Sequence, residues 1–124
     1  MCEGINILIV DDDDISLFIA KKSVEAACPK AKVFVCKNGE EALHKLTSLN
    51  PDILLLDINM PVMNGWSLLD NLLNKVKKLD FPIYMVSSSL DEKDKEKSQS
   101  YDFVKGFINK PINKEKIKSL QCFG

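Results

Sequence analysis

The sequence contains no arginine and only one histidine among its 124 residues. All 17 basic residues are therefore lysines, and with 18 acidic residues they leave a formal net charge of -1. Arginine is the usual bidentate reader of guanine edges and phosphates, and a basic field supplies most non-specific affinity for nucleic acid. This composition argues against a nucleic-acid-binding domain, so we expect no nucleic-acid partner.

Long apolar segments and metal-type cysteine spacings are also missing. No apolar run approaches the roughly 20 residues that span a bilayer, and the N-terminus has no signal-peptide pattern. Cys2, Cys28, Cys36 and Cys122 form neither a C-x-x-C motif nor a zinc knuckle. The lone His44 leaves little material for Ser-His or Cys-His catalysis. We expect a cytoplasmic protein with reduced cysteines and no membrane partner.

What the sequence does contain is a large apolar fraction, at 45% of its residues. A chain of this length falls in the range of about 100–150 residues where single domains cluster. Such a chain can bury a core without disulfides or a structural metal. We therefore expect one domain over residues 1–124, with no output domain.

Five short apolar runs, rich in β-branched residues, recur along the chain. They are continuous rather than alternating, which is typical of strands buried on both faces of a parallel sheet. Right-handed crossovers between five βα units then give an α/β fold with helices on both faces. The predicted fold is a flavodoxin-like, doubly wound (βα)5 domain with a five-stranded parallel sheet in the order 2-1-3-4-5. The runs are residues 5–10, 33–36, 53–56, 83–86 and 107–108.

Segments with helical spacing separate these runs. In the first of them, Ile15, Phe18, Ile19 and Val24 are predicted to form the face that packs on the sheet. Asp13 and Asp14 lie just before that helix and are interpreted mainly as its cap and dipole partners. The later helical segments are predicted at 42–49, 66–76, 91–103 and 117–120.

Polar side chains follow four of the five predicted strands. Four aspartates, residues 11–14, follow the first strand, and Asp57 follows the third. Ser87 follows the fourth strand, and Lys110 comes shortly after the fifth. In open parallel sheets, ligands bind outside the carboxyl ends of the strands, at the point where the strand order reverses. These side chains are therefore expected to meet in one crevice.

The chemistry of this set points to phosphoryl transfer. Converging carboxylates repel one another and favour a cation, and hard oxygen ligands suit Mg²⁺. A lysine and a hydroxyl facing the same point would hold a phosphoryl group. An aspartate can itself be the nucleophile that forms an aspartyl phosphate, and Asp57, alone at the end of the central strand, is our candidate.

The sequence resembles the receiver domain of two-component response regulators over nearly its whole length. The resemblance also extends to the chemotaxis-type, stand-alone receivers of bacteria. The matching pieces are Ile9-Val10-Asp11-Asp12, Leu56-Asp57-Ile58-Asn59-Met60-Pro61-Val62-Met63-Asn64-Gly65, Ser87, and Lys110-Pro111. Each piece alone is a weak signal, whereas their order and spacing together are specific.

This resemblance implies a role for each matching residue. Asp57 would accept a phosphoryl group from a sensor histidine kinase or a histidine phosphotransfer protein. Asp12, Asp57 and the backbone carbonyl of Asn59 would coordinate Mg²⁺, with Asp11 acting through water. Lys110 would pair with the phosphoryl oxygens. The Lys110–Pro111 peptide bond is expected to be cis, as is usual in this family.

The resemblance further implies a switch built from Ser87 and Phe107. Ser87 would hydrogen-bond to the phosphoryl group, leaving space into which Phe107 turns, and the altered surface would then bind a downstream protein. The domain would catalyse only its own phosphorylation and dephosphorylation, so it is not otherwise an enzyme. Phe107 lacks the hydroxyl of the tyrosine frequent at this position, which excludes a hydrogen-bonded version of the switch.

Other functions fit the sequence less well. A haloacid-dehalogenase-type phosphatase would use Asp11 and Asp13, but Ile15 replaces its usual threonine or valine. A flavodoxin-like electron carrier would need a hydroxyl- and glycine-rich loop where four aspartates stand, and the G-x-x-x-x-G-K-S/T motif of nucleotide hydrolases is absent. The alternative that stays open is a receiver-like interaction module that works without phosphorylation.

Overall fold

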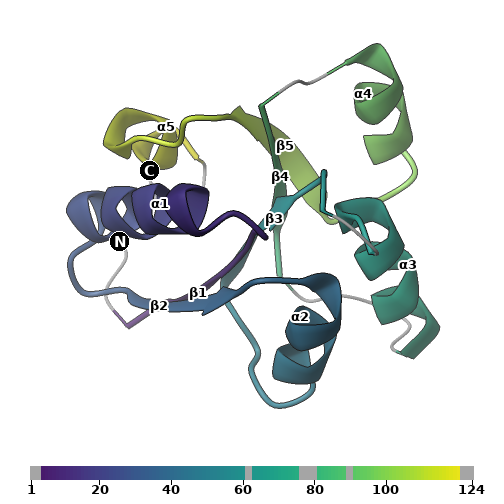
Figure 1. Ribbon diagram of the computed structural model, residues 1–124, viewed down its shortest axis with the longest axis horizontal. Coiled ribbons are helices and arrows are strands. Elements are labelled where there is room, and N and C mark those ends of the chain that lie inside the picture. Colours follow the sequence, from purple (N-terminus) through teal and green to yellow (C-terminus); the bar gives the residue numbers. More distant parts are fainter. Residues whose placement is uncertain (1–3, 61–62, 76–80, 89–90, 121–124) are drawn as a thin grey trace.

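Five parallel strands form a single sheet at the centre of the molecule (Figure 1). The computed structural model describes residues 4–60, 63–75, 81–88 and 91–120. The strand order β2-β1-β3-β4-β5 confirms the predicted flavodoxin-like, doubly wound α/β fold. The strands are β1 (Asn6–Val10), β2 (Lys32–Cys36), β3 (Ile53–Asp57), β4 (Ile83–Ser87) and β5 (Val104–Asn109).

Helices cover both faces of the sheet and complete a three-layer arrangement. Helices α1 and α5 lie side by side on one face, while α2, α3 and α4 lie on the opposite side (Figure 1). The helices are α1 (Asp14–Ala27), α2 (Gly39–Leu46), α3 (Gly65–Lys75), α4 (Glu92–Ser98) and α5 (Lys114–Lys118). Within these described residues, no helix is both long and apolar enough to cross a membrane.

Short polar side chains begin all five helices, including α3, where Oδ1 of Asn64 accepts a hydrogen bond from the backbone N–H of Ser67 at 2.9 Å. The Asp13 carboxylate accepts a hydrogen bond from the backbone N–H of Ser16 at 2.9 Å, which confirms its interpretation as a helix cap. Asn38 caps α2 in the same way, accepting from the N–H of Glu41 at 2.7 Å. Asp91 and Asn113 cap α4 and α5. These caps fix where each helix starts, and so how it leaves the preceding strand.

Successive residues of the central strands point into two different apolar layers, as the period of a strand requires. On β1, Leu8 and Val10 pack in the layer that includes α3 side chains, whereas Ile7 and Ile9 pack in the layer that includes α1 and α5. All four are at most 2% exposed. Burial on both faces explains why the strands read as continuous apolar runs.

The predicted inner face of α1 is wrong at three of its four positions. Ile15 is 69% exposed and Phe18 is 61% exposed, and Ile19 is also exposed. The buried face is formed by Leu17, Ala20 and Val24, of which only Val24 was predicted. Both stripes have helical spacing, and the small Ala20 lets the second stripe approach the sheet.

Two other expectations need correction at their edges, and a third falls on a residue outside the described part of the chain. Strand β5 runs from Val104 to Asn109 and is longer than the predicted pair 107–108, because Lys105 and Gly106 interrupt the apolar run without ending the strand. Helix α4 ends at Ser98 rather than reaching residue 103. Val76, the last predicted core position of the third helical segment, lies outside the described residues.

The expectation of four reduced cysteines is wrong at Cys28. Cys28, completely buried beyond the end of α1, is disulfide-bonded. Cys36 at the end of β2 is a buried free thiol, and burial raises its pKa to about 11. Cys2 and Cys122 lie outside the described residues.

Candidate functional site

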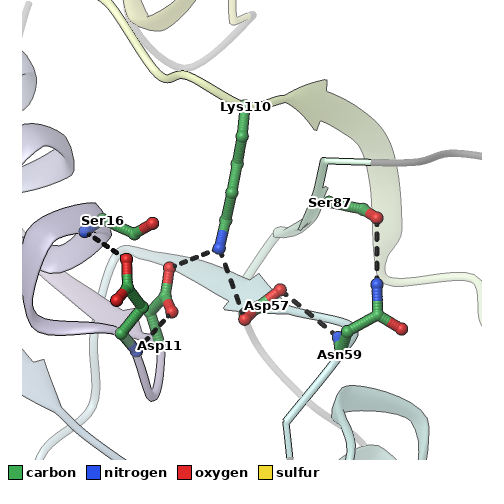
Figure 2. A network of polar contacts seen from close by, with 7 residues as sticks. Asp11, Ser16, Asp57, Asn59, Ser87 and Lys110 are labelled. Carbon is green, nitrogen blue, oxygen red and sulfur yellow. Dashed lines mark hydrogen bonds and ion pairs between the residues drawn. The ribbon is translucent and has the colours of Figure 1, made fainter.

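The parallel sheet brings the predicted polar side chains to one edge. Asp11 directly follows β1, Asp57 is the last residue of β3, Ser87 is the last residue of β4, and Lys110 directly follows β5. The register aligns these ends, since Ser87 pairs with Asn109, the residue before Lys110. Figure 2 shows the side chains of Asp11, Asp57 and Lys110 pointing toward one another, while the side chain of Ser87 points toward Asn59.

Three carboxylates gather at the centre of this edge. One oxygen from each of Asp11, Asp12 and Asp57 lies within 4.8 Å of the other two. Asp11 and Asp57 are only 4% and 3% exposed, whereas Asp12 is exposed. Asp11 is held in place by the backbone N–H of Asp13, which donates to its Oδ1 at 2.9 Å.

Lys110 is the cation that balances part of this negative charge. Its Nζ lies 2.8 Å from Oδ2 of Asp11 and 3.5 Å from Oδ2 of Asp57 (Figure 2). Burial lowers the pKa of Lys110, but the hydrogen bond to Asp11 and the charges of both carboxylates outweigh burial, so the net pKa is raised. Lys110 therefore remains protonated at neutral pH.

The local environment makes Asp57 an unusual carboxylate. Burial is the main cause that raises its pKa, to about 6, and the negative charge of Asp11 raises it further in the same direction. The charge of Lys110 and the backbone N–H of Asn59 oppose this rise. The one lysine does not fully compensate the acidic group, so the site attracts additional positive charge.

Asn59 and Ser87 are joined beside this carboxylate. The backbone N–H of Asn59 donates to Oδ1 of Asp57 at 3.3 Å, and its side-chain Nδ2 donates to Oγ of Ser87 at 3.2 Å (Figure 2). Ser87 is completely buried. Phe107, on the neighbouring strand β5, is partly buried and packs against the apolar layer of α3.

Gly65 allows the start of α3 to lie directly against the backbone of Asp57. A Cβ at position 65 would stand 2.6 Å from the carbonyl oxygen of Asp57, a distance that real Cβ atoms do not adopt. The N–H of Gly65 also donates to the carbonyl of Ile58 at 2.9 Å. The glycine of the Asn64-Gly65 pair is therefore required by close approach.

A cavity of about 330 Å³ opens next to Asp11 and Lys110. Its lining includes residues that the sequence did not single out for the site, because they come from α1 and from loops rather than from strand ends. Ile19, which was predicted to face the sheet, is one of them, and nothing in the sequence distinguishes its apolar side chain from that of a core residue. These additional lining residues are Ser16, Ile19, Ser88, Pro111 and Ile112. The Lys110–Pro111 peptide bond is cis, as expected.

The acidic group fits a small divalent cation. Mg²⁺ binds oxygen at about 2.0–2.1 Å, so ligands on opposite sides of the ion lie about 4.2 Å apart. The three carboxylate oxygens, all within 4.8 Å of one another, come close to that spacing. Few protein oxygens are present, which suits an ion that keeps several waters.

Comparison with known proteins agrees with this geometry. The family model of the response regulator receiver domain matches residues 7–120. The chain is 40% identical over 91 residues to the protein-glutamate methylesterase/protein-glutamine glutaminase of Bacillus subtilis (strain 168), covering 71% of this chain and 24% of that protein. It is 37% identical over 92 residues to the nitrate/nitrite response regulator protein NarL of Escherichia coli (strain K12), covering 74% of this chain and 42% of that protein. The chain thus spans about a quarter to two fifths of these relatives.

Solved structures of similar length are also response regulators. A two-component response regulator from Cytophaga hutchinsonii has a TM-score of 0.81 at 30% identity, covering 91% of this chain and 90% of that chain. One from Legionella pneumophila has a TM-score of 0.80 at 28% identity, covering 93% and 94%. Chemotaxis response regulator CheY4 of Vibrio cholerae shares the fold over the full length of both chains, with a TM-score of 0.81 at 24% identity. The chain belongs to the family of response regulator receiver domains, the signalling modules of two-component systems.

Proposed function

We propose that Asp57 accepts a phosphoryl group from a phosphohistidine of a sensor histidine kinase or a histidine phosphotransfer protein. A carboxylate oxygen of Asp57 attacks phosphorus, the bond between phosphorus and the histidine nitrogen breaks, and that nitrogen takes back the electron pair. Later attack by water on phosphorus releases inorganic phosphate and restores the carboxylate. Receiver domains are generally signalling modules rather than enzymes, and this cycle acts only on the domain itself.

The observation that carries this proposal is the setting of Asp57. The carboxylate is 3% exposed, lies at the end of β3 in the centre of the sheet, and is 3.5 Å from the ammonium of Lys110. A pKa of about 6 leaves it mainly ionised, and so nucleophilic, at neutral pH. A structural aspartate would gain nothing from a second buried carboxylate placed beside it.

Asp12, Asp57 and the backbone carbonyl of Asn59 are the residues that would hold Mg²⁺, with Asp11 acting through water. When bound, the ion supplies positive charge to the transferring phosphoryl oxygens. Lys110 supplies the second positive charge, since the sequence contains no arginine. Asp11 keeps that ammonium in place through its 2.8 Å ion pair.

Ser87 and Phe107 form the proposed switch. At present the hydroxyl oxygen of Ser87 accepts a hydrogen bond from the side chain of Asn59 at 3.2 Å. In the phosphorylated domain Ser87 turns to donate to a phosphoryl oxygen, and the partly buried Phe107 moves into the space it leaves. The surface around α4, β5 and α5 changes as a result, and a downstream protein in the cytoplasm reads that change.

Intact mass spectrometry after incubation with acetyl phosphate and Mg²⁺ tests the phosphorylation directly. We expect one phosphoryl adduct on the wild-type chain and none on Asp57→Asn or Asp57→Ala. Asp52→Asn serves as a matched control, because Asp52 lies just before β3, at the opposite end of that strand from Asp57, and the variant should keep the adduct. An unmodified wild type would support the alternative, a receiver-like interaction module that needs no phosphorylation.

Trp66 provides a separate test of the metal. It follows Gly65, whose backbone packs against Asp57, and it is the only tryptophan in the chain. Titration with Mg²⁺ should change its fluorescence, and Asp12→Asn should shift that titration to higher concentrations. A titration that is identical in both proteins would remove Asp12 from the ligand set.

A further inference from the structure

The loop that carries Lys110 is held by a second lysine. This loop connects β5 to α5, and Lys116 on α5 reaches back over it. The Nζ of Lys116 donates to the backbone carbonyl of Asn109 at 2.9 Å and to that of Pro111 at 3.0 Å. These two carbonyls belong to the residues immediately before and after Lys110.

The loop is also fixed from its other sides. The hydroxyl of Ser23 on α1 lies 3.1 Å from the carbonyl oxygen of Ile112 and 2.7 Å from that of Ile19. The backbone N–H of Lys110 itself donates to the carbonyl of Ser87 at 2.9 Å. Side chains from both flanking helices therefore hold the backbone from which the Lys110 side chain extends.

We propose that Lys116 is a positioning residue for Lys110 in the phosphoryl transfer, an inference that rests on the proposed function of the site. The ammonium of Lys110 ends a flexible four-carbon stem, and it must stay close to both Asp11 and Asp57. Its reach is therefore set by where its backbone begins. Misplacing a catalytic group by about 1 Å can reduce a rate by up to about a hundredfold.

The chemistry of the contact suits lysine. An ammonium carries three donors and no acceptor, so one side chain can bind two carbonyls at once. Lys118, two residues further along the same helix, is exposed, and it supplies a matched control with the same charge. The role of Lys116 is therefore separable from the general positive charge of α5.

The kinetic test compares Lys116→Met, Lys116→Arg and Lys118→Met for phosphorylation by acetyl phosphate at saturating Mg²⁺. Methionine keeps an unbranched side chain that is one atom shorter and loses the donors, and we expect the rate constant to fall by about 3- to 10-fold. Arginine keeps donors and charge and should restore most of the rate, while Lys118→Met should match the wild type. The affinity for Mg²⁺ should be unchanged in all three, since the acidic residues lie on other strand ends.

A double-mutant cycle with Lys110→Met separates positioning from general destabilisation. If Lys116 acts through Lys110, Lys116→Met should cause no further loss once Lys110 is replaced. An equal loss in both backgrounds, or an equal loss in Lys118→Met, would overturn the proposal. Thermal unfolding of each variant identifies the temperature range in which all of them are folded, and the cycle is measured there.

Hydrogen exchange gives a readout that does not depend on phosphorylation. The amide of Lys110, bonded to the carbonyl of Ser87, should exchange faster in Lys116→Met than in the wild type or Lys116→Arg. If the wild type takes no phosphoryl group but this difference is seen, the proposed function fails while the loop contact stands. If the wild type is phosphorylated and neither the rate nor the exchange responds to Lys116→Met, only the positioning role fails.

Discussion

Helices α5 and α4 flank the same edge of the sheet but are attached to the molecule in different ways. Helix α5 has only five residues, yet it buries Ile117 completely between α1 and the sheet. Helix α4 has seven residues, all within the described part of the chain, and none of them is buried. One short helix is thus anchored by apolar packing, and the other is not.

Helix α4 is instead held by polar and aromatic contacts to Trp66 of α3. The indole Nε1 of Trp66 donates to Oδ1 of Asp94 at 3.1 Å, and the ammonium of Lys97 lies 5.8 Å from the indole ring centroid. Beyond the helix, Tyr101 stacks on Trp66 at 5.4 Å and donates its hydroxyl to Asp70 at 2.7 Å. Such contacts contribute about 1 kcal/mol each, whereas a buried isoleucine contributes several.

This difference matters because the two helices serve different parts of the site. Helix α5 supports the loop with Lys110, whose position must not vary, and a buried anchor suits that task. Helix α4 follows the loop after Ser87, where the proposed switch begins. Polar contacts of this kind can be rearranged at little free-energy cost, so in the proposed switch α4 moves and alters the surface that it shares with β5 and α5, while the backbone of α5 keeps its position.

The largest effect should come from removing the anchor of α5. Ile117→Ala deletes a completely buried side chain and should lower the free energy of unfolding by about 2–5 kcal/mol. Lys95→Ala on α4, which removes an exposed side chain, should change it by no more than about 0.5 kcal/mol. Urea unfolding measures both, and equal losses would show that α4 is anchored as firmly as α5.

A second large effect should come from the acidic site at the carboxyl ends of the strands. The pKa of Asp57, about 6 in the folded chain against 3.8 ordinarily, is raised by burial and by Asp11. The free energy of unfolding is therefore not reduced by Asp57 below about pH 4, where its carboxyl group is protonated. It falls as the pH rises through 6 and the buried group ionises. Asp57→Asn should raise the free energy of unfolding at pH 7.5 by up to about 3 kcal/mol in metal-free buffer, at 1.36 kcal/mol per pKa unit.

Two further measurements on Asp57→Asn, one at low pH and one with added Mg²⁺, serve as controls. At pH 3.5 the gain from Asp57→Asn should vanish, because the wild-type carboxyl group is then protonated. Adding Mg²⁺ at pH 7.5 should stabilise the wild type more than the variant. A variant that is less stable than the wild type at pH 7.5 without metal would contradict the repulsion between Asp11 and Asp57.

Tyr101, which follows α4 and packs on Trp66, should make the stability of the fold depend on pH in the alkaline range. Burial, followed by the hydrogen bond to Asp70 and its charge, raises the pKa of Tyr101 to about 12 from 10. The folded state favours the neutral phenol. The stabilising contribution of Tyr101 to the free energy of unfolding is therefore fully present below pH 10 and is lost between pH 10 and 12. The loss is about 2–3 kcal/mol at most.

Tyr101→Phe removes that titration and isolates it from other alkaline groups, such as Cys36. The variant should lose about 1 kcal/mol at pH 7, from the missing hydrogen bond to Asp70. It should then lose less stability than the wild type between pH 10 and 12. Chemical unfolding at pH 7, 10 and 12 gives this comparison, and parallel pH curves for both proteins would rule out the tyrosine as the cause.

Trp66→Phe should loosen α4 with little effect elsewhere. Phenylalanine keeps a ring that can stack on Tyr101 but cannot donate to Asp94, and because Trp66 is only 4% exposed the smaller ring also leaves a cavity, so the loss in global stability should be about 1–3 kcal/mol. Hydrogen exchange should accelerate for amides of α4, whereas amides of α5 should retain their protection. Faster exchange in α5 as well would mean that the two helices are not independently attached.

The sequence predicted most of the architecture because the strands are buried on both faces. Continuous apolar runs identified β1, β3 and β4 closely, and parallel pairing then placed Asp11, Asp57, Ser87 and Lys110 at one edge. The edge strand β5 was predicted too short, since an edge strand tolerates Lys105 in its middle.

Other features could not be predicted because they depend on tertiary packing or backbone geometry. The contacts of Lys116 require the path of the loop around Lys110, which no spacing in the sequence encodes. The attachment of α4 through Trp66 joins residues 28 positions apart in the chain. In α1 two stripes have equally good helical spacing, and the larger side chains of Ile15 and Phe18 favoured the wrong one.

The smallest expected effect tests that correction on α1. Phe18 is 61% exposed, and its ring contacts water and the ammonium of Lys22, whose Nζ lies 5.6 Å from the ring centroid. Phe18→Ser should therefore change the free energy of unfolding by no more than about 0.5 kcal/mol. Its neighbour Leu17 is 6% exposed, and Leu17→Ala should cost about 2–4 kcal/mol because it leaves a cavity against the sheet. A large loss in Phe18→Ser with a small loss in Leu17→Ala would mean that α1 is rotated about its axis, and that the face which anchors α5 is not the one described.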